Sequence, residues 1–86
     1  MTRNEITDQL IKIFLERFEI ENPGLDDDLR EEHEFDSIDA LELLHEIELM
    51  LASKLTQDEK KQAMERSTLN QIVDYIEALA ATRRTV

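Results

Sequence analysis

A serine at position 37 lies between two aspartates, Asp36 and Asp39, in the stretch EFDSIDALELLHEIELML. A serine at the start of a helix either caps that helix by accepting a backbone N–H or carries a covalently attached group. The amide groups and the positive dipole end of a helix N-terminus favour a phosphate at such a place. Asp36 is an equally good cap and would leave Ser37 free, although the local chemistry alone favours a capping serine.

The helix that would present this serine is predicted over residues 37–51. At about 100° per residue, one side carries an apolar stripe that we expect to face the core, formed by Ala40, Leu44, Ile47 and Leu51. An acidic stripe follows Asp39, Glu42 and Glu46, and the side away from the core carries Ile38, His45 and Leu49. This outer side is either an ordinary solvated face or a docking face for a partner, and its position beside Ser37 favours docking.

Three more helices are indicated by capping boxes and helical spacing of apolar residues. They cover residues 3–19, residues 57–64 and the segment that begins at Thr68. The predicted fold class is therefore all-α, a small four-helix bundle with a long first loop and a short third helix. We expect a single domain over residues 1–86, with an ordered core of about residues 3–80 and a frayed tail at residues 82–86.

The long first loop, IENPGLDDDLREEHEFD, contains the only proline and the only glycine of the chain. Pro23 and Gly24 suit the central positions of a type II turn. Loops of this length in small domains are usually functional or anchored by their own side chains. The expected anchors into the core are Leu25, Leu29 and Phe35.

Composition narrows the classes of function. Acidic residues number 21 against 10 basic ones, for a net charge of -11, which disfavours nucleic acid and anionic lipid and attracts basic partners. The chain has no cysteine, so disulfides, thiolate metal sites and cysteine nucleophiles are excluded. No signal peptide and no membrane span is recognised, and we expect a cytoplasmic location. His33 and His45 lack ligand spacing and the acidic loop lacks the EF-hand pattern, so we assign no metal site.

The chain resembles the acyl carrier protein family. The resemblance rests on DSID opening an acidic helix that continues ALELLHEIELML, on the long first loop, and on the final STLNQIVDYIEAL, and it covers about residues 6–79. It implies a non-enzymatic phosphoprotein in which a phosphopantetheinyl transferase moves 4′-phosphopantetheine from coenzyme A onto Ser37, beside Asp36. The arm would hold acyl groups as thioesters and present them to acyl-transferring or acyl-modifying enzymes with basic patches, in fatty acid or related specialised lipid or polyketide-like biosynthesis.

The resemblance also implies roles for individual residues, in a carrier that we expect to be a monomer. Partner docking would fall on Ile38, Asp39, Leu41, Glu42, His45, Glu48 and Leu49. The acyl chain would be sheltered among Phe35, Leu44, Ile47, Leu51, Leu69 and Ile72, each of which is also a normal core residue.

The sequence departs from the family pattern at several positions. Glu34 and Phe35 replace a small pair before Asp36, and Leu49 and Met50 stand where the family usually has acids. We therefore favour a specialised carrier. Two alternatives stay open: an unmodified acidic helical module for protein–protein interaction, in which Ser37 only caps, and a carrier of aminoacyl groups.

Overall fold

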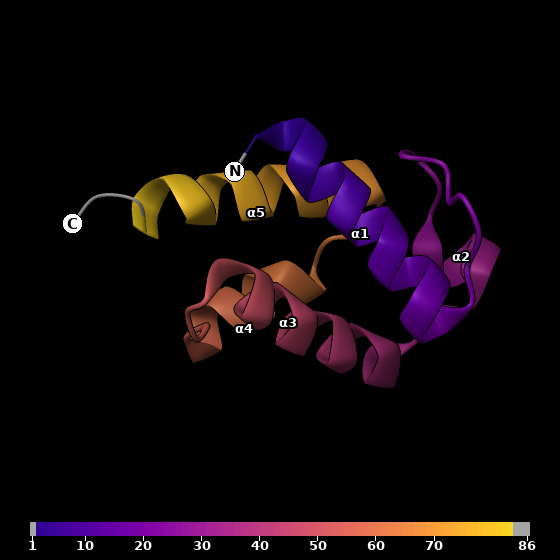
Figure 1. Cartoon of the computed structure of the whole chain (residues 1–86). Helices are drawn as coiled ribbons and strands as arrows, with labels where there is room; N and C mark the ends of the chain where they lie inside the picture. Colours follow the sequence, from indigo (N-terminus) through magenta and orange to yellow (C-terminus); the bar gives the residue numbers. More distant parts are fainter. Residues whose placement is uncertain (1, 84–86) are drawn as a thin grey trace.

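The computed structural model describes residues 2–83, and these residues contain helices and no strand. The helices are α1 (Arg3–Phe18), α2 (Leu29–His33), α3 (Ser37–Leu51), α4 (Gln57–Met64) and α5 (Leu69–Arg83). Helix α1 packs against α5 and α3, and α4 packs against α3 (Figure 1). The predicted all-α class is confirmed. Within the described residues, no helix combines the length and apolarity that crossing a membrane requires.

The helix starts follow from local side-chain chemistry. Capping boxes pair Thr2 with Glu5 at α1 and Thr56 with Glu59 at α4, as predicted. Helix α3 has the predicted bounds, and α1 ends one residue earlier than predicted, where Glu19 adopts a left-handed φ of 56°. Helix α5 continues through Arg83, past the expected end of the ordered core near residue 80, and residues 84–86 lie outside the described part of the chain.

Helix α2 lies within the connection that we expected to be a loop, so the predicted count of four helices becomes five among the described residues. The Asp28 carboxylate caps it by accepting the N–H groups of Arg30 and Glu31 at 3.0 and 3.1 Å. The Leu29 side chain is buried and its N–H donates to the Ser67 carbonyl at 2.9 Å. A helix of five residues has little stability alone, so it needs this local cap together with the tertiary bond and burial of Leu29.

The rest of this connection is attached to the start of α5 by polar contacts. The Asn70 N–H donates to the Leu25 carbonyl at 2.9 Å, and the Asn70 side-chain amide donates to Asp26 at 2.7 Å. The Leu25 side chain is exposed, so the prediction that it anchors the loop in the core is wrong, whereas Leu29 is buried as predicted. The predicted type II turn is also wrong, because Gly24 does not have a positive φ.

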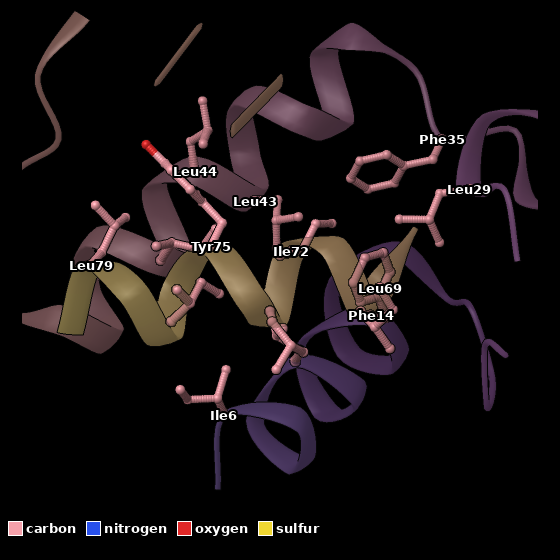
Figure 2. Packing of buried hydrophobic residues seen from close by; sticks show 14 of the residues in the cluster. Ile6, Phe14, Leu29, Phe35, Leu43, Leu44, Leu69, Ile72, Tyr75 and Leu79 are labelled. Atoms are coloured by element: carbon pink, nitrogen blue, oxygen red, sulfur yellow. The ribbon is translucent and has the colours of Figure 1, made fainter. Parts of the chain in front are cut away.

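The core fills the space between α1, α3 and α5 and reaches the α2–α3 connection. Phe35 enters it from that connection and packs on Phe14 and Phe18, with ring centroids 5.4 and 5.2 Å away. Figure 2 shows Phe35 beside Leu29 at one end of the core, far from Leu79. In the predicted stripe of α3, Leu44 and Ile47 are buried, Ala40 and Leu51 are partly buried, and Leu43 is a buried residue that the prediction missed.

Candidate functional site

Asp36, and not Ser37, caps the first turn of α3. The Asp36 carboxylate accepts the Asp39 N–H at 2.9 Å, and the Asp39 carboxylate accepts the Asp36 N–H at 3.3 Å. In this reciprocal capping box, both side chains satisfy backbone donors that a helix start otherwise leaves unpaired. Ser37 is the first helical residue, so the cap leaves its hydroxyl without a structural task. The capping interpretation of Ser37 that local chemistry favoured is therefore wrong.

The Ser37 side chain is exposed, and its hydroxyl makes no hydrogen bond to any residue in the range 2–83. It borders an open hollow of about 410 Å³, whose walls come from the first turn of α2, the α2–α3 connection and the start of α3. The other residues that line this hollow are Arg30, Glu34, Phe35 and Asp36. A reagent can therefore reach the hydroxyl from solvent.

The electrostatics at Ser37 combine opposing effects. The start of α3 carries the positive end of the helix dipole, which stabilises an anion by about 0.3–1 kcal/mol at an exposed site. Glu34, Asp36 and Asp39 surround the same point with carboxylates, which repel an anion. A phosphate ester on Ser37 would thus gain from the helix end and would need a further cation to offset the carboxylates.

Neither histidine is placed to activate Ser37 as a base. His33 contacts Asp27 at 3.3 Å, and His45 lies 4.0 Å from Glu48, one turn further along α3. In the part of the chain that is described, no group of three or more His, Cys, Asp or Glu side chains is arranged to hold a metal ion. What the described residues offer at this place is an accessible serine hydroxyl.

The outer face of α3 is apolar over much of its length. Ile38, Leu41 and Leu49 are 74%, 56% and 62% exposed, and His45 is exposed between them. Glu42 is exposed on the same helix. The predicted docking positions Ile38, Leu41, Glu42, His45 and Leu49 therefore all lie at the surface, on the helix that begins with Ser37.

Two of the other acidic residues of α3 are committed to partners within the chain. Glu48 accepts the Leu55 N–H at 2.8 Å, and this bond lowers the pKa of the Glu48 carboxyl below its usual range. Glu46, which the sequence placed in an acidic stripe, forms an ion pair of 2.9 Å with Arg17 of α1. Asp39 belongs to the capping box, so Glu42 is the α3 acid that has no partner among residues 2–83. Glu46 therefore has its charge balanced by an arginine, whereas Glu48 and Asp39 keep their negative charge but are held by backbone N–H groups.

A small cavity lies between α3, α4 and α5. Its volume is about 20 Å³, which is room for about one water molecule. Four of the six residues expected to shelter an acyl chain line it, namely Phe35, Leu44, Ile47 and Ile72. Leu51 and Leu69 do not line it. The sequence reasoning missed further lining residues, which come from α2, α3, α4, α5 and the connection before α5: Leu29, Arg30, Ala40, Leu43, Ala63, Met64, Arg66, Ser67 and Tyr75.

Phe35 and Arg30 line both the interior cavity and the hollow at Ser37. The buried Phe35 ring therefore stands between them and forms a shared wall. Arg30 was not singled out by the sequence reasoning, because its role depends on where α2 places it. No local pattern in the sequence marks such a position.

Comparison with known proteins gives one match. The family model described as PP-binding, phosphopantetheine attachment site, matches residues 8–76, which include all of α2, α3 and α4. No curated protein and no solved structure is significantly similar to the chain.

Proposed function

The chain belongs to the phosphopantetheine attachment family, and from this premise we propose that it is an acyl carrier protein whose Ser37 holds the prosthetic group. Domains of this family are the attachment site for covalent 4′-phosphopantetheine. The observation that carries the assignment to Ser37 is the capping box of Asp36 and Asp39, which leaves the neighbouring hydroxyl exposed and without a hydrogen bond among the described residues.

The residues around Ser37 fit such a group. The hydroxyl opens on a hollow with space for the start of an extended arm, and the helix N-terminus favours the negative charge of a phosphodiester. In the loading step, the Ser37 oxygen would form a bond to the phosphorus that carries pantetheine, and the pyrophosphate P–O bond of coenzyme A would break. The nucleotide half would leave with its phosphates, and the Ser37 proton would pass to a base of the transferase. The bound group supplies a thiol, which holds acyl groups as thioesters and which this cysteine-free chain lacks.

The outer face of α3 is the proposed docking surface for the transferase and for acyl-handling enzymes. Ile38, Leu41 and Leu49 supply apolar contact area, and Glu42 supplies a charge that orients a basic patch on the partner. A carrier must leave each partner, so these contacts should be small and short-lived. Glu48 mainly stabilises the fold and contributes less to docking, because its carboxylate accepts the Leu55 N–H.

We propose that the apolar cavity behind Phe35 shelters the acyl chain. Its present volume of about 20 Å³ is too small for more than a fragment, so an acyl chain must move α4 or the lining side chains outward. Helix α4 is the element best suited to move, because it has no buried residue of its own and contributes only partly buried Ala63 and Met64 to the wall.

The departures from the family pattern favour a specialised carrier in fatty acid or related lipid or polyketide-like biosynthesis. Phe35 lines the cavity at its border with the hollow, and Leu49 makes the far end of the docking surface apolar, whereas Met50 packs partly buried against the core. Enzymes that serve a general, strongly acidic carrier would fit this surface poorly. Normal elongation on this carrier by a general fatty acid synthase would contradict the specialised role.

The test is to incubate the purified chain with coenzyme A and a phosphopantetheinyl transferase of broad specificity, and to measure its intact mass. We expect the addition of one phosphopantetheine, which Ser37→Ala abolishes. Ser67→Ala is the matched control, because Ser67 lies near the cavity and bonds to Gln71, and it should be labelled normally. A folded wild-type chain that gains no mass would leave the unmodified interaction module as the function, and preferential loading with amino acids would indicate the aminoacyl carrier.

A further inference from the structure

Arg30 differs from the other arginines among residues 2–83 in its partners. Each of the others has a carboxylate or an aromatic ring beside it: Arg3 binds Asp74 and Glu77, Arg17 binds Glu46, Arg83 binds Glu59, and Arg66 lies over the Tyr75 ring. Within residues 2–83, the only polar partner of the Arg30 guanidinium is the Met64 carbonyl, at a long 3.5 Å. In a chain of net charge -11, an arginine without a carboxylate partner is unexpected.

The backbone places Arg30 beside Ser37. Arg30 is the second residue of α2, and the Phe35 N–H donates to the Leu29 carbonyl at 3.0 Å, which closes the end of this helix. The chain then reaches Ser37 after Asp36, and Arg30 and Ser37 line the same hollow. The contact of Leu29 with Ser67 holds α2 against the rest of the fold, so this placement does not depend on α2 alone.

The carboxylates around the hollow indicate which ligand Arg30 would bind. Glu34 and Asp36 line the hollow, so a phosphodiester on Ser37 adds a negative charge where two carboxylates already lie. A guanidinium presents several N–H donors in a planar fork that matches phosphate oxygens. We propose that Arg30 is a positioning residue that binds the phosphate of the group attached to Ser37, an inference that rests on the function proposed above.

This contact gives the arm a direction. Arg30 and Phe35 line both the surface hollow and the interior cavity, so a phosphate held by Arg30 starts the arm along the wall that leads to the cavity. Without this contact, the arm would be free to leave Ser37 in any direction over the surface. The guanidinium gives up only the long contact with Met64 when it binds the phosphate.

The experiment compares the unmodified and the phosphopantetheinylated forms, with attachment at Ser37 checked by mass, for the wild type, Arg30→Gln, Arg30→Lys and Arg66→Gln. The readout is the change in Tm that modification causes at low salt. For an exposed contact, we expect the change in Tm on modification to be higher, that is more stabilising, by about 2–6 °C in the wild type than in Arg30→Gln. Arg30→Lys should keep part of the difference, because it keeps the charge but not the fork.

Arg66→Gln is the matched control, because Arg66 lines the cavity but not the hollow, and it should keep the wild-type change in Tm. A second readout needs no variant: the Arg30 Nε–H resonance of isotopically labelled wild type should shift on modification, and the shift should shrink at high salt. Equal changes in Tm for wild type and Arg30→Gln, with an unmoved Arg30 resonance, would overturn the inference while leaving Ser37 as the attachment site. A chain that accepts no group at Ser37 would overturn both.

Discussion

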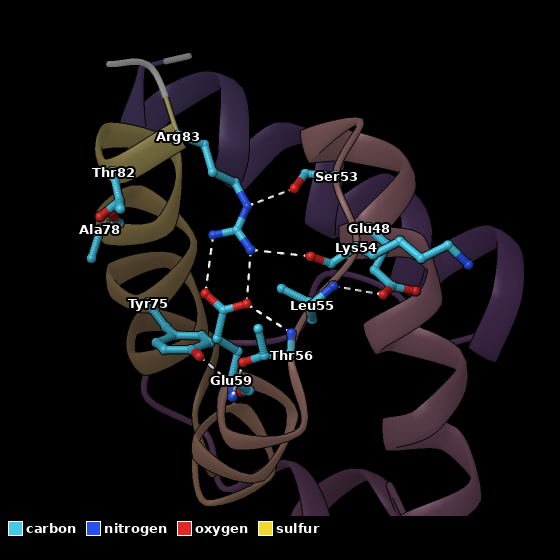
Figure 3. Close-up of polar contacts among 10 residues, drawn as sticks. All are labelled: Glu48, Ser53, Lys54, Leu55, Thr56, Glu59, Tyr75, Ala78, Thr82 and Arg83. Atoms are coloured by element: carbon cyan, nitrogen blue, oxygen red, sulfur yellow. Dashed lines mark hydrogen bonds and ion pairs between the residues drawn. The ribbon is translucent and has the colours of Figure 1, made fainter. Parts of the chain in front are cut away.

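Arg83 holds Glu59 through two parallel N–H···O bonds of 2.8 and 3.1 Å, which join the last turn of α5 to the first turn of α4 (Figure 3). The same guanidinium donates to the Ser53 hydroxyl at 2.8 Å and to the Lys54 carbonyl at 3.2 Å. One side chain therefore ties α5 to the α3–α4 connection and to α4. We call these bonds of Arg83 the clamp. The clamp holds the first turn of α4 at Glu59, whereas Ala63 and Met64, which line the cavity, lie at the other end of this helix and are left to move.

The clamp makes stability depend on pH. The Arg83 guanidinium, followed by the Thr56 N–H, holds the pKa of the Glu59 carboxyl below its usual range. A lowered pKa in the folded state stabilises the fold above the ordinary glutamate pKa of about 4.3, and this contribution is lost as the pH falls through the lowered value. We expect Glu59→Gln to reduce the free energy of unfolding by about 1–2 kcal/mol at pH 7, and the difference from wild type to shrink in acid.

The measurement for Glu59 is urea denaturation of both proteins over a series of pH values. Glu65→Gln, an exposed position at the end of α4, is the control and should follow the wild-type pH profile. A constant difference between Glu59→Gln and wild type at every pH would show that the ionised carboxylate is not what stabilises the clamp.

The capping box predicts that substitutions at the adjacent residues 36 and 37 change stability by different amounts. Asp36→Ala removes the acceptor for the Asp39 N–H and should destabilise the unmodified protein by about 1 kcal/mol. Ser37→Ala removes an exposed hydroxyl and should change stability by less than about 0.5 kcal/mol. Chemical denaturation measures both, with Asp36→Asn as a variant that keeps a capping oxygen. A loss of stability in Ser37→Ala as large as that in Asp36→Ala would mean that the serine does cap.

Substitutions of Glu42 and Glu48 should have different effects, one on partner docking and the other on the stability of the fold. Glu48→Ala removes the acceptor of the Leu55 N–H and should lower Tm. Glu42→Ala removes a surface charge and should leave Tm unchanged, while it slows loading by the transferase by about two- to fivefold at low salt. Thermal denaturation and initial loading rates measure the two effects. If Glu42→Ala loads normally across a range of salt concentrations, the charge at position 42 does not contribute to docking.

Phe35 should be a main contributor to stability. Its ring packs on Phe14 and Phe18 and is 6% exposed, so Phe35→Ala should destabilise the chain by about 3–5 kcal/mol. Phe35→Leu keeps most of the apolar volume and should cost less. Urea denaturation measures both, and Leu49→Ala on the exposed face of α3 is the control, with an expected change below about 0.5 kcal/mol. A small effect of Phe35→Ala would mean that the ring does not anchor the start of α3.

The parts of this protein that could be read directly from the sequence are those that depend on residues close together in the chain. The bounds of α3 and α4 and the capping boxes at Thr2 and Thr56 follow from contacts three residues apart, and they were predicted correctly. The exposure of Ile38, His45 and Leu49 follows from helical geometry in the same way, and that of Leu41 was implied by the family resemblance. The family resemblance, which rests on the stretch around Ser37, is confirmed by the family match over residues 8–76.

Other features depend on contacts between residues that are far apart in the sequence, so only the tertiary structure determined them. Helix α2 forms because Ser67 supplies an acceptor for Leu29, and Leu25 is exposed because backbone contacts with Asn70 hold that part of the loop. Glu46 pairs with the cation of Arg17, and the carboxylate of Glu48 stays ionised but accepts the Leu55 N–H, so two acids of a stripe that looks uniformly acidic in the sequence are held by partners within the chain. A carboxylate has the same identity whether it faces water or a partner, so only the packing of neighbouring elements determines which acids and which arginine remain available for a ligand.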